Sequence, residues 1–388
     1  MPQWTVPCSV YRGGTSRGLF FHEKDLPKSD LKNRIFFSGI DAYNPSQING
    51  LGSGTSHTSK VIVVSNPSVK GVDIDYTFYQ IGIAEEIVDA EGTCGNLMAA
   101  VGAFAVDEGL AGAREKDGQV TVRAYNRNIG KIIRIKVPVE EGQAKVTGDF
   151  LMPGVVTKGA KITVDILSPG GGKTGKTLPA GRKTEIEVHG KNYEVSFVDI
   201  VNPFVYVSAD VFGLRGSESN HEAAQRIDLL SELEEIRVHA AIAAGMAKTI
   251  DEARNIPSIP KIALIGKPHM YATTSGITIY KDEVDIVAKM VSMNRFHRTF
   301  AGSGLYNLAA SVLLHGTIPN QHAFKENGRF EQKIRIGHPE GIAEVRVQLT
   351  GDGTDVTFVG LERTARRIMK GALFIPPDVQ MKVDFPEK

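Results

Sequence analysis

Two stretches of sequence decide the fold: CGNLMAAV at residues 94–101 and AGSGLYNLAA at residues 301–310. Each stretch opens with small, turn-forming residues and continues into apolar residues at helical spacing. Each also follows strand-like sequence. The two stretches begin 207 residues apart, at positions 94 and 301 of a 388-residue chain. Their recurrence suggests a duplicated unit in which a glycine-containing loop starts an apolar helix, although such patterns also recur by chance.

The rest of the chain predicts mostly short strands. Segments rich in Val, Ile, Thr and aromatic residues, or with alternating polarity, are separated by turns that contain glycine. The predicted strands are 4–11, 18–22, 60–65, 73–81, 119–126, 130–138, 161–167, 185–189, 192–200, 204–209, 261–266, 332–336, 342–350, 354–360 and 371–375. The predicted helices are 97–108, ended by Gly109; one or two helices over 219–247; 284–291; and 305–314, ended by Gly316.

Length and composition indicate a globular protein with two domains. A single hydrophobic core stops growing near ~250–300 residues, and this chain has 388. The formal net charge is +1, from 45 basic and 44 acidic side chains. Such a balance provides no general attraction for nucleic acid or for an anionic membrane. We therefore expect neither of these partners.

Cysteine content and the distribution of apolar residues indicate the compartment. The two cysteines, Cys8 and Cys94, are too few for a disulfide framework and fit a reducing environment. The first residues, MPQWTV, lack the basic start and apolar core of a signal peptide. No apolar run approaches the ~18 residues that a membrane helix requires. We therefore expect a soluble, cytoplasmic protein.

Residues 170–177, GGGKTGKT, match the nucleotide-binding pattern G-x-x-x-x-G-K-[ST], and a predicted strand precedes them. In such a loop the Lys-Thr pair opens a helix whose amide groups hold the phosphates. Here LPAG follows at residues 178–181, and strand-like sequence resumes at residue 185. Because no room remains for a helix, we interpret the stretch as a basic loop that does not bind a nucleotide.

Three segments in the first hundred residues combine glycine with hydroxyl side chains. They are RGGTSRG at residues 12–18, GLGSGTSHTSK at 50–60 and GTCGN at 92–96. Glycine allows close backbone approach and hydroxyl groups add hydrogen-bond donors, so such segments can bind anions. Each segment alone could be an ordinary tight turn. Three of them together, two with a reactive side chain, favour an anion-binding site.

Cys94 and Lys60 are the side chains in these segments that could move a proton. Cys94 lies at the start of a predicted helix, where the helix dipole favours thiolate over thiol. Lysine holds its proton more tightly, so Lys60 needs burial or positive neighbours before it can act as a base. The alternatives are a buried apolar role for Cys94 and a solvated strand-edge position for Lys60. Cys94 is therefore the easier base, whereas Lys60 could be an acid, a base or a charge anchor.

His297 is a third candidate, because it stands in MNRFHR just before the second glycine-containing loop. It could face a ligand, or its role could be structural. The sequence contains no H-x-x-x-H or C-x-x-C motif, and no dinucleotide fingerprint opens a βαβ unit. We therefore expect no metal and no cofactor.

Several of these stretches resemble the 2-methylaconitate cis-trans isomerase (PrpF-type) family. The matching segments are YRGGTSRGLFF at 11–21, GLG at 50–52, TSHTSKV at 55–61, CGNL at 94–97, VGAFA at 101–105, DIVNP at 199–203 and RTARR at 363–367. They extend from residue 11 to residue 367, so the resemblance covers nearly the whole chain. No segment is specific by itself, but the combination is.

The resemblance implies an α+β fold of the diaminopimelate-epimerase-like type. In this fold two similar domains each wrap a curved β-sheet or barrel around a central helix, and the active site lies in the cleft between them. Residues 1–148 and 371–388 are then expected to form the N-terminal domain, and residues 149–370 the C-terminal domain. The N-termini of the two central helices are expected to bind a substrate with two or three carboxylates.

The resemblance also implies which residues act. The family's working lysine and cysteine correspond to Lys60 and Cys94, the expected catalytic residues. The expected substrate-binding residues are Thr15, Ser16, Thr55, Ser56, Gly95, Asn96, His297, Gly302, Ser303 and Gly304. The sequence has Arg17 where the family usually has lysine. Ala301 stands where amino-acid epimerases carry their second cysteine, which disfavours racemisation by two thiols.

These assignments predict a cofactor-independent isomerase that moves a proton and a double bond in a small unsaturated di- or tricarboxylate, such as 2-methylaconitate. Methylitaconate Δ-isomerase, aconitate isomerase and 4-oxalomesaconate tautomerase activities are alternatives with the same chemistry. A non-catalytic carboxylate-binding accessory protein and an amino-acid epimerase are alternatives of other classes. The expected partner is the small acid, and a homodimer is compatible with the sequence. Whether Lys60 or Cys94 is the base stays open.

Overall fold

The computed structural model describes residues 2–28, 30–111, 115–152, 154–219, 222–223, 225–256, 259–292, 295–325 and 329–377. The chain forms two compact units: unit 1 comprises residues 1–164 and 362–388, and unit 2 comprises residues 165–361. The chain passes from unit 1 to unit 2 in β10 (Ile162–Leu167) and returns in β21 (Val356–Arg363). Within the described residues, no helix combines the length and the apolar character needed to cross a membrane.

In its described residues, unit 1 contains one ladder of strands and two α-helices. Its strands are β1 (Trp4–Gly13), β2 (Ser16–His22), β3 (Lys60–Ser65), β4 (Ile74–Ile81), β5 (Val88–Asp89), β6 (Glu115–Lys116), β7 (Gln119–Asn126), β8 (Lys131–Glu140), β9 (Gln143–Ala144) and β22 (Ala365–Ile375), and its helices are α1 (Leu31–Ile40) and α2 (Leu97–Asp107). β22 and β2 both pair antiparallel with β1, and β2 runs parallel to β3. β3 is antiparallel to β4, β4 is parallel to β7, and β7 is antiparallel to β8.

Unit 2 contains a second ladder and four helices among its described residues. Its strands are β11 (Thr184–Val188), β12 (Lys191–Ile200), β13 (Asn202–Ser208), β14 (Lys261–Gly266), β15 (Tyr271–Ala272), β16 (Thr278–Ile279), β17 (Ile286–Ser292), β18 (Arg295–Phe296), β19 (Glu331–His338) and β20 (Gly341–Leu349), and its helices are α4 (Ile227–Ala243), α5 (Ile250–Arg254), α6 (Gly302–Leu313) and α7 (Ile318–His322). β12 is antiparallel to β13, β13 is parallel to β14, and β14 is antiparallel to β17. β17 is parallel to β19, which is antiparallel to β20.

The two ladders follow the same order of pairing. In unit 1, β1, β2, β3, β4, β7 and β8 alternate between antiparallel and parallel partners, and β12, β13, β14, β17, β19 and β20 repeat this alternation in unit 2. Each parallel pair is joined through a helix, because a parallel connection must carry the chain back to the same end of the sheet. This repeat confirms the duplicated architecture, and the mixture of strands with few helices confirms the α+β class.

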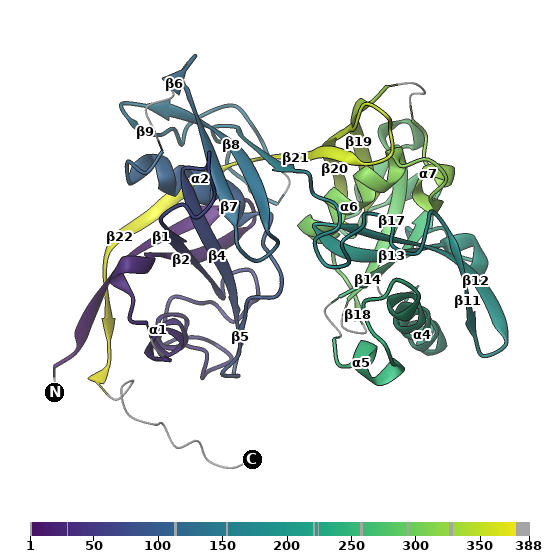
Figure 1. Ribbon diagram of the computed structural model, residues 1–388, viewed down its shortest axis with the longest axis horizontal. Helices are drawn as coiled ribbons and strands as arrows, with labels where there is room; N and C mark the ends of the chain where they lie inside the picture. Colours follow the sequence, from purple (N-terminus) through teal and green to yellow (C-terminus); the bar gives the residue numbers. More distant parts are fainter. Residues whose placement is uncertain are drawn as a thin grey trace, which may run out of the picture. The chain divides into compact units, whose positions relative to one another are not determined.

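Each unit surrounds one apolar helix. All residues of α2 from Leu97 to Val106 are buried, as are all residues of α6 from Ser303 to Leu313. α2 contacts β1, β7, β8 and β22, whereas α6 contacts β12, β13, β19 and β20 (Figure 1). A helix that is apolar on all sides is stable in water only when protein encloses it. Both helices are confirmed, although α6 begins three residues before its predicted start, at Gly302.

The helix predicted over residues 284–291 is wrong, because this stretch forms strand β17. β17 lies between β14 and β19 in the ladder, and its residues from Ile286 to Val291 are buried. A strand that is covered on both faces has no alternation of polarity, so its apolar run resembles that of a buried helix. The predicted strands, by contrast, each overlap a strand of the structure.

Further helical segments differ from expectation, and the short helices α5 and α7 are absent from the predicted helices. α1 is absent from the predicted helices, although Leu31, Ile35, Phe36 and Ile40 have helical spacing and Asp41 ends the helix with a positive φ of 64°. The one or two helices predicted over 219–247 correspond to α4. Residues 220, 221 and 224 of that prediction, and residues 378–388 of the expected N-terminal domain, lie outside the described residues.

A buried asparagine fixes the sharp turn between β12 and β13. The turn passes through Val201, whose φ of 63° is unusual for a β-branched residue. Asn307, fully buried on α6, donates from Nδ2 to the carbonyl groups of Val198 at 2.9 Å, Ile200 at 3.1 Å and Asn202 at 2.8 Å. The two N–H bonds of this amide thereby serve three carbonyl groups, one of them shared between two acceptors, and hold the turn against the central helix.

Asn307→Ala is expected to lower the free energy of unfolding by about 3 kcal/mol, because the buried carbonyl groups lose their donor. The hydroxyl of Tyr206 also loses its acceptor, since it donates to Oδ1 of Asn307 at 2.9 Å. Urea-induced unfolding measures the effect. The control is Asn192→Ala on the exposed part of β12, which should change the free energy by about 0.5 kcal/mol at most. Equal effects of the two substitutions would contradict the role given to Asn307.

Candidate active site

Lys60 is the first residue of β3, and its side chain is held inside unit 1. The residue is 8% exposed. Its Nζ donates a hydrogen bond of 2.6 Å to Oε1 of Gln80 and lies 5.0 Å from the ring centroid of Phe78. The interpretation of Lys60 as a solvated strand-edge lysine is therefore wrong. Its burial and its polar partner fit a functional side chain instead.

Cys94 lies three residues before the first residue of α2 and is half-buried. Its Sγ is 3.8 Å from Oγ of Ser16, the first residue of β2. Gly95, which follows, is buried, and Asn96 is the last residue before the helix. Because the N-terminus of a helix carries partial positive charge, this position suits a thiolate or a bound carboxylate.

Strand β2 brings the segments of Lys60 and Cys94 to the same part of unit 1. Ser16 contacts Cys94, and two residues further along β2 lies Gly18. A Cβ atom on Gly18 would be 3.0 Å from the carbonyl oxygen of Lys60 and 3.1 Å from Cδ1 of Leu97, the first residue of α2. Glycine at this position therefore lets the start of β3 and the start of α2 approach one strand.

A network of side chains fixes the N-terminal turn of α2. Asn96 donates from Nδ2 to Oγ1 of the exposed Thr15 at 3.0 Å. Its Oδ1 accepts a hydrogen bond of 3.1 Å from Nε of Arg363, which also donates from Nη1 to the carbonyl group of Glu362 at 3.0 Å. Sequence reasoning does not select Arg363 as a site residue, because only its place in the RTARR segment marks it. The structure adds this cation to the predicted site residues.

The loop over residues 50–60 is tied to the β1–β2 turn by Arg17. The backbone N–H of Arg17 donates to the carbonyl group of His57 at 2.9 Å, and its Nη2 donates to that of Leu51 at 2.9 Å. Burial, with a contribution from the nearby Lys60, lowers the pKa of His57. Arg17, which stands where the family usually has lysine, therefore holds the loop that ends at Lys60.

Thr55 and Ser56, two predicted substrate-binding residues, lie exposed in this loop. The carbonyl group of Thr55 accepts from Oγ of Ser59 at 2.9 Å, and that of Ser56 accepts from Nε2 of Gln80 at 3.2 Å. Their backbone oxygens thus hold the loop together. Substrate binding by their hydroxyl groups stays a prediction.

Gly14→Ala is expected to disturb the site as well as the backbone. Gly14 has a φ of +53°, and an added Cβ would lie 2.4 Å from Oδ1 of Asn96. The positive φ should cost about 1–2 kcal/mol, and the displaced Asn96 should lower kcat/KM in addition. Gly71→Ala is the matched control, because Gly71 has a φ of +81° with nothing within 4 Å of the added atom. Thermal unfolding and turnover of both variants check the prediction, and an equal loss of kcat/KM in the two variants would contradict it.

Unit 2 carries the second predicted loop, at the N-terminus of α6. Gly302 has open space around it, and Ser303 accepts a hydrogen bond of 3.1 Å at Oγ from Nδ2 of Asn202. A Cβ on Gly304 would lie 2.5 Å from Cζ of Phe204, so the packing of the helix requires glycine there. Asn202 is 6% exposed, and within the described part of the chain its Oδ1 has no hydrogen-bond partner. This turn therefore combines amide groups with a buried polar side chain.

His297, half-buried, lies on the segment that leads from β18 to α6. Its backbone N–H donates to the carbonyl group of Met290 at 2.8 Å, and its Nδ1 accepts from the N–H of Thr299 at 3.1 Å. Burial lowers the pKa of the neighbouring His338 to about 4, an effect that Glu340 opposes and His297 increases. The ring of His297 thus shapes the segment before α6, and ligand binding by it stays a prediction.

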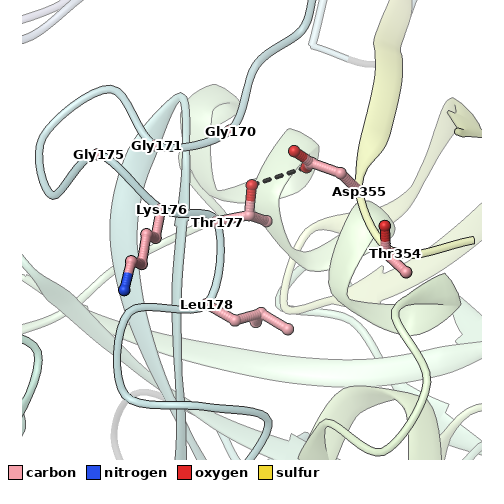
Figure 2. A pocket seen from close by; sticks show the side chains of 8 residues that line it. All are labelled: Gly170, Gly171, Gly175, Lys176, Thr177, Leu178, Thr354 and Asp355. Atoms are coloured by element: carbon pink, nitrogen blue, oxygen red, sulfur yellow. Dashed lines mark hydrogen bonds between the residues drawn. The ribbon is translucent and has the colours of Figure 1, made fainter.

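The glycine-rich loop of unit 2 borders a hollow of about 350 Å³ (Figure 2). The residues that line it are Gly170, Gly171, Gly175, Lys176, Thr177, Leu178, Thr354 and Asp355. Residues 171–180 form turns and bends, which confirms that no helix follows the Lys-Thr pair. The hollow therefore lacks the helix N-terminus on which phosphate binding depends.

A buried carboxylate of the protein accepts hydrogen bonds from the backbone N–H groups of this loop. Oδ2 of the fully buried Asp199 accepts from the N–H groups of Lys173 at 2.9 Å and Thr174 at 2.7 Å. The hydroxyl of Thr177 donates to Oδ1 of Asp355 at 2.7 Å, as Figure 2 shows. The groups that would hold a nucleotide phosphate thus bind the protein's own acidic side chains. We conclude that the motif is a structural loop.

Comparison with known proteins yields relatives over the full length of the chain. The PrpF protein family matches residues 3–376. The 3-methylitaconate isomerase of Eubacterium barkeri is 37% identical over 377 residues, which cover 96% of this chain and 98% of that protein. The 2-methyl-aconitate isomerase of Shewanella oneidensis is 33% identical over 391 residues, which cover 97% of this chain and 98% of that protein.

A solved structure agrees with these relatives. The crystal structure of a methylitaconate-delta-isomerase has a TM-score of 0.88 and 34% sequence identity, with 100% of both chains covered. This similarity confirms the fold class that the resemblance implies. All three proteins are named as isomerases, which confirms the expected reaction class. The chain therefore belongs to the PrpF protein family.

Proposed function

We propose that this chain is a cofactor-independent isomerase that moves a proton, and with it a double bond, in a small unsaturated di- or tricarboxylate. The observation that carries the proposal is the arrangement in unit 1, where the thiol of Cys94 contacts Ser16 of β2. The backbone of Lys60 lies against Gly18 of the same strand, beside the first residue of α2. A thiol and an amine can exchange protons with carbon. The adjacent helix N-terminus favours the negative charge of the substrate.

The proposed reaction begins when a base removes a proton from the carbon next to a double bond that is conjugated to a carboxylate. The electron pair of the broken C–H bond moves into the conjugated system and gives a dienolate. Return of one proton to another carbon shifts the double bond, whereas rotation before return to the same carbon exchanges cis and trans isomers. One proton leaves and one returns, so the step balances without an oxidant or reductant.

The residues of the site divide this work. Lys60 or Cys94 is the base, and the other can return the proton or stabilise charge. The amide groups of Gly95 and Asn96 and the hydroxyl groups of Thr15 and Ser16 are proposed to stabilise the dienolate and one carboxylate. Amide groups of Gly302, Ser303 and Gly304 in unit 2 are proposed to bind a further carboxylate.

The relatives narrow the substrate class. Their names include 3-methylitaconate and 2-methyl-aconitate, which are unsaturated acids with two and three carboxyl groups. We propose 2-methylaconitate as the first candidate substrate. Methylitaconate, aconitate and 4-oxalomesaconate are the alternatives, since they differ only in the substituents that the site must accommodate. An accessory protein that binds such acids without converting them is the alternative of another class.

The test is incubation of the purified protein with each acid in D2O, followed by proton NMR. Conversion of one acid with incorporation of deuterium is the expected result, because the base exchanges its proton with solvent. Diaminopimelate and proline serve as control substrates and should keep their configuration. Conversion of none of the unsaturated acids would contradict the proposal and favour the accessory protein.

A further inference from the structure

Gln80, on β4, is hydrogen-bonded to one of the two candidate bases. Gln80 and Lys60 are register partners in the β3–β4 ladder, so their side chains point to the same face of the sheet. Oε1 of Gln80 accepts from Nζ of Lys60 at 2.6 Å. Sequence reasoning does not select Gln80, because a single glutamine in a strand carries no motif.

The carboxamide group of Gln80 has one orientation that satisfies its neighbours. Its Nε2 donates to the carbonyl groups of Ser59 at 2.7 Å and Ser56 at 3.2 Å. A carboxamide turned by half a rotation would place its oxygen against these carbonyl oxygens and its N–H groups against the lysine ammonium. The hydrogen-bond network therefore assigns the oxygen atom to Lys60.

The partner of Lys60 is thus a neutral acceptor. An Asp or Glu at this place would form an ion pair and compensate the charge of the lysine. Among the described residues, no carboxylate forms an ion pair with Lys60. Its other close groups are the ring of Phe78 at 5.0 Å and His57, whose pKa is lowered by burial and by this lysine. An aromatic ring attracts a cation without carrying a net charge. The lysine side chain is therefore held from two directions by groups that carry no net charge.

We propose that Gln80 is the positioning residue of Lys60, which it holds in place while leaving the lysine charge uncompensated for a substrate carboxylate or dienolate. The consequence for turnover rests on the proposed function. The position of Lys60 does not, because it can be measured in the protein without substrate. The same carboxamide also ties Ser56 to the lysine, so it couples the loop over residues 50–60 to Lys60.

The first experiment measures the position of Lys60 by NMR in protein labelled with ¹³C at the lysine Cε atoms. In the wild type, the ring current of Phe78 should shift the Lys60 signal away from those of exposed lysines, and Lys60→Arg identifies the signal by removing it. Gln80→Met has a similar length but no acceptor, so the signal should move to the position of exposed lysines. Gln80→Glu retains an acceptor and should keep the shifted signal. Gln119→Met, at an exposed position on β7, is the matched control and should change nothing.

The second experiment measures turnover of the same variants. Gln80→Met should lower kcat by about 10–100-fold through misplacement of Lys60, with little change in KM. Gln80→Glu should also lower kcat, although its lysine is in place, because the new carboxylate compensates the charge and its second oxygen replaces the Nε2 donor to Ser59 and Ser56. If Gln80 had a purely structural role, a variant that keeps the position of Lys60 would also keep the wild-type kcat. Gln80→Asn, which is shorter by one methylene group, replaces Gln80→Met if that variant does not fold.

Each outcome decides the proposal. A Lys60 signal that stays shifted in Gln80→Met or Gln80→Asn would overturn the positioning role, whatever the activity. If the signal moves in Gln80→Met but the wild-type protein converts none of the acids, the positioning role is upheld and the proposed function is contradicted instead. Full turnover of Gln80→Glu would overturn the part of the proposal that concerns charge.

Discussion

Lys60→Ala is expected to lower kcat by about 10²–10⁴-fold, the range that a positioned acid or base contributes to proton transfer. The substitution removes the ammonium group that Gln80 and Phe78 hold. No other described lysine is hydrogen-bonded to Gln80, so no neighbouring amine replaces it. Steady-state kinetics on the acid identified by NMR in D2O measures the effect. Lys70→Ala, at an exposed position of unit 1, should keep full activity.

Binding separates catalysis from simple recognition in this variant. Calorimetric titration with trans-aconitate, an unsaturated tricarboxylate, should show that Lys60→Ala still binds, because the amide groups proposed to bind its carboxylates remain. Retained binding with lost turnover supports an enzyme. Turnover within about twofold of the wild type would remove Lys60 from the mechanism, since even a weak acid–base contribution exceeds this factor.

Cys94→Ala is expected to lower kcat by about 10²-fold or more, because the group that faces Ser16 can then neither accept nor return a proton. Cys94→Ser should lose nearly as much, since a serine hydroxyl does not ionise near neutral pH without a partner base. Comparison of the two variants separates the acid–base role from packing, because serine preserves the size of the side chain. An active Cys94→Ser would contradict a thiolate mechanism.

Alkylation provides a second measurement of the same residue. Iodoacetamide should inactivate the wild type, and a bound tricarboxylate should protect it, because the thiolate is the reactive form of cysteine. The control is built into the chain: burial raises the pKa of Cys8 to about 12, so this thiol stays protonated and unreactive. Modification at Cys8 with Cys94 untouched, as read by mass spectrometry, would contradict this assignment.

The central helices and most strands could be predicted because their determinants are local. The small residues before Leu97 and before Leu305 mark where each helix starts, and the uninterrupted apolar sequence that follows fits only a surrounded helix. β17 could not be distinguished from a helix, because its polarity does not alternate when both faces are covered. The strands that pair with it, β14 and β19, are set by the tertiary structure and cannot be read from the local sequence.

The site was predictable only where chemistry and loop composition coincide. Cys94 and Lys60 stand in glycine-rich segments and attract notice. Gln80 and Arg363 do not, because their importance comes from partners 20 and 267 residues away along the chain. The GGGKTGKT loop shows that a motif can also suggest a site that is not there. The N–H groups that the pattern would assign to a phosphate bind the carboxylate of Asp199 instead.

The pairing of β22 with β1 has a consequence for synthesis on the ribosome. Trp4 pairs with Ile375, so this edge of unit 1 stays open until β22 has been translated. Unit 2 is one uninterrupted segment, from 165 to 361. All of its strands are therefore translated before β22 of unit 1. Since contacts between distant residues form late and leave strand edges exposed meanwhile, the nascent chain carries Lys60 and Cys94 on a unit that β22 completes only after unit 2 has been translated.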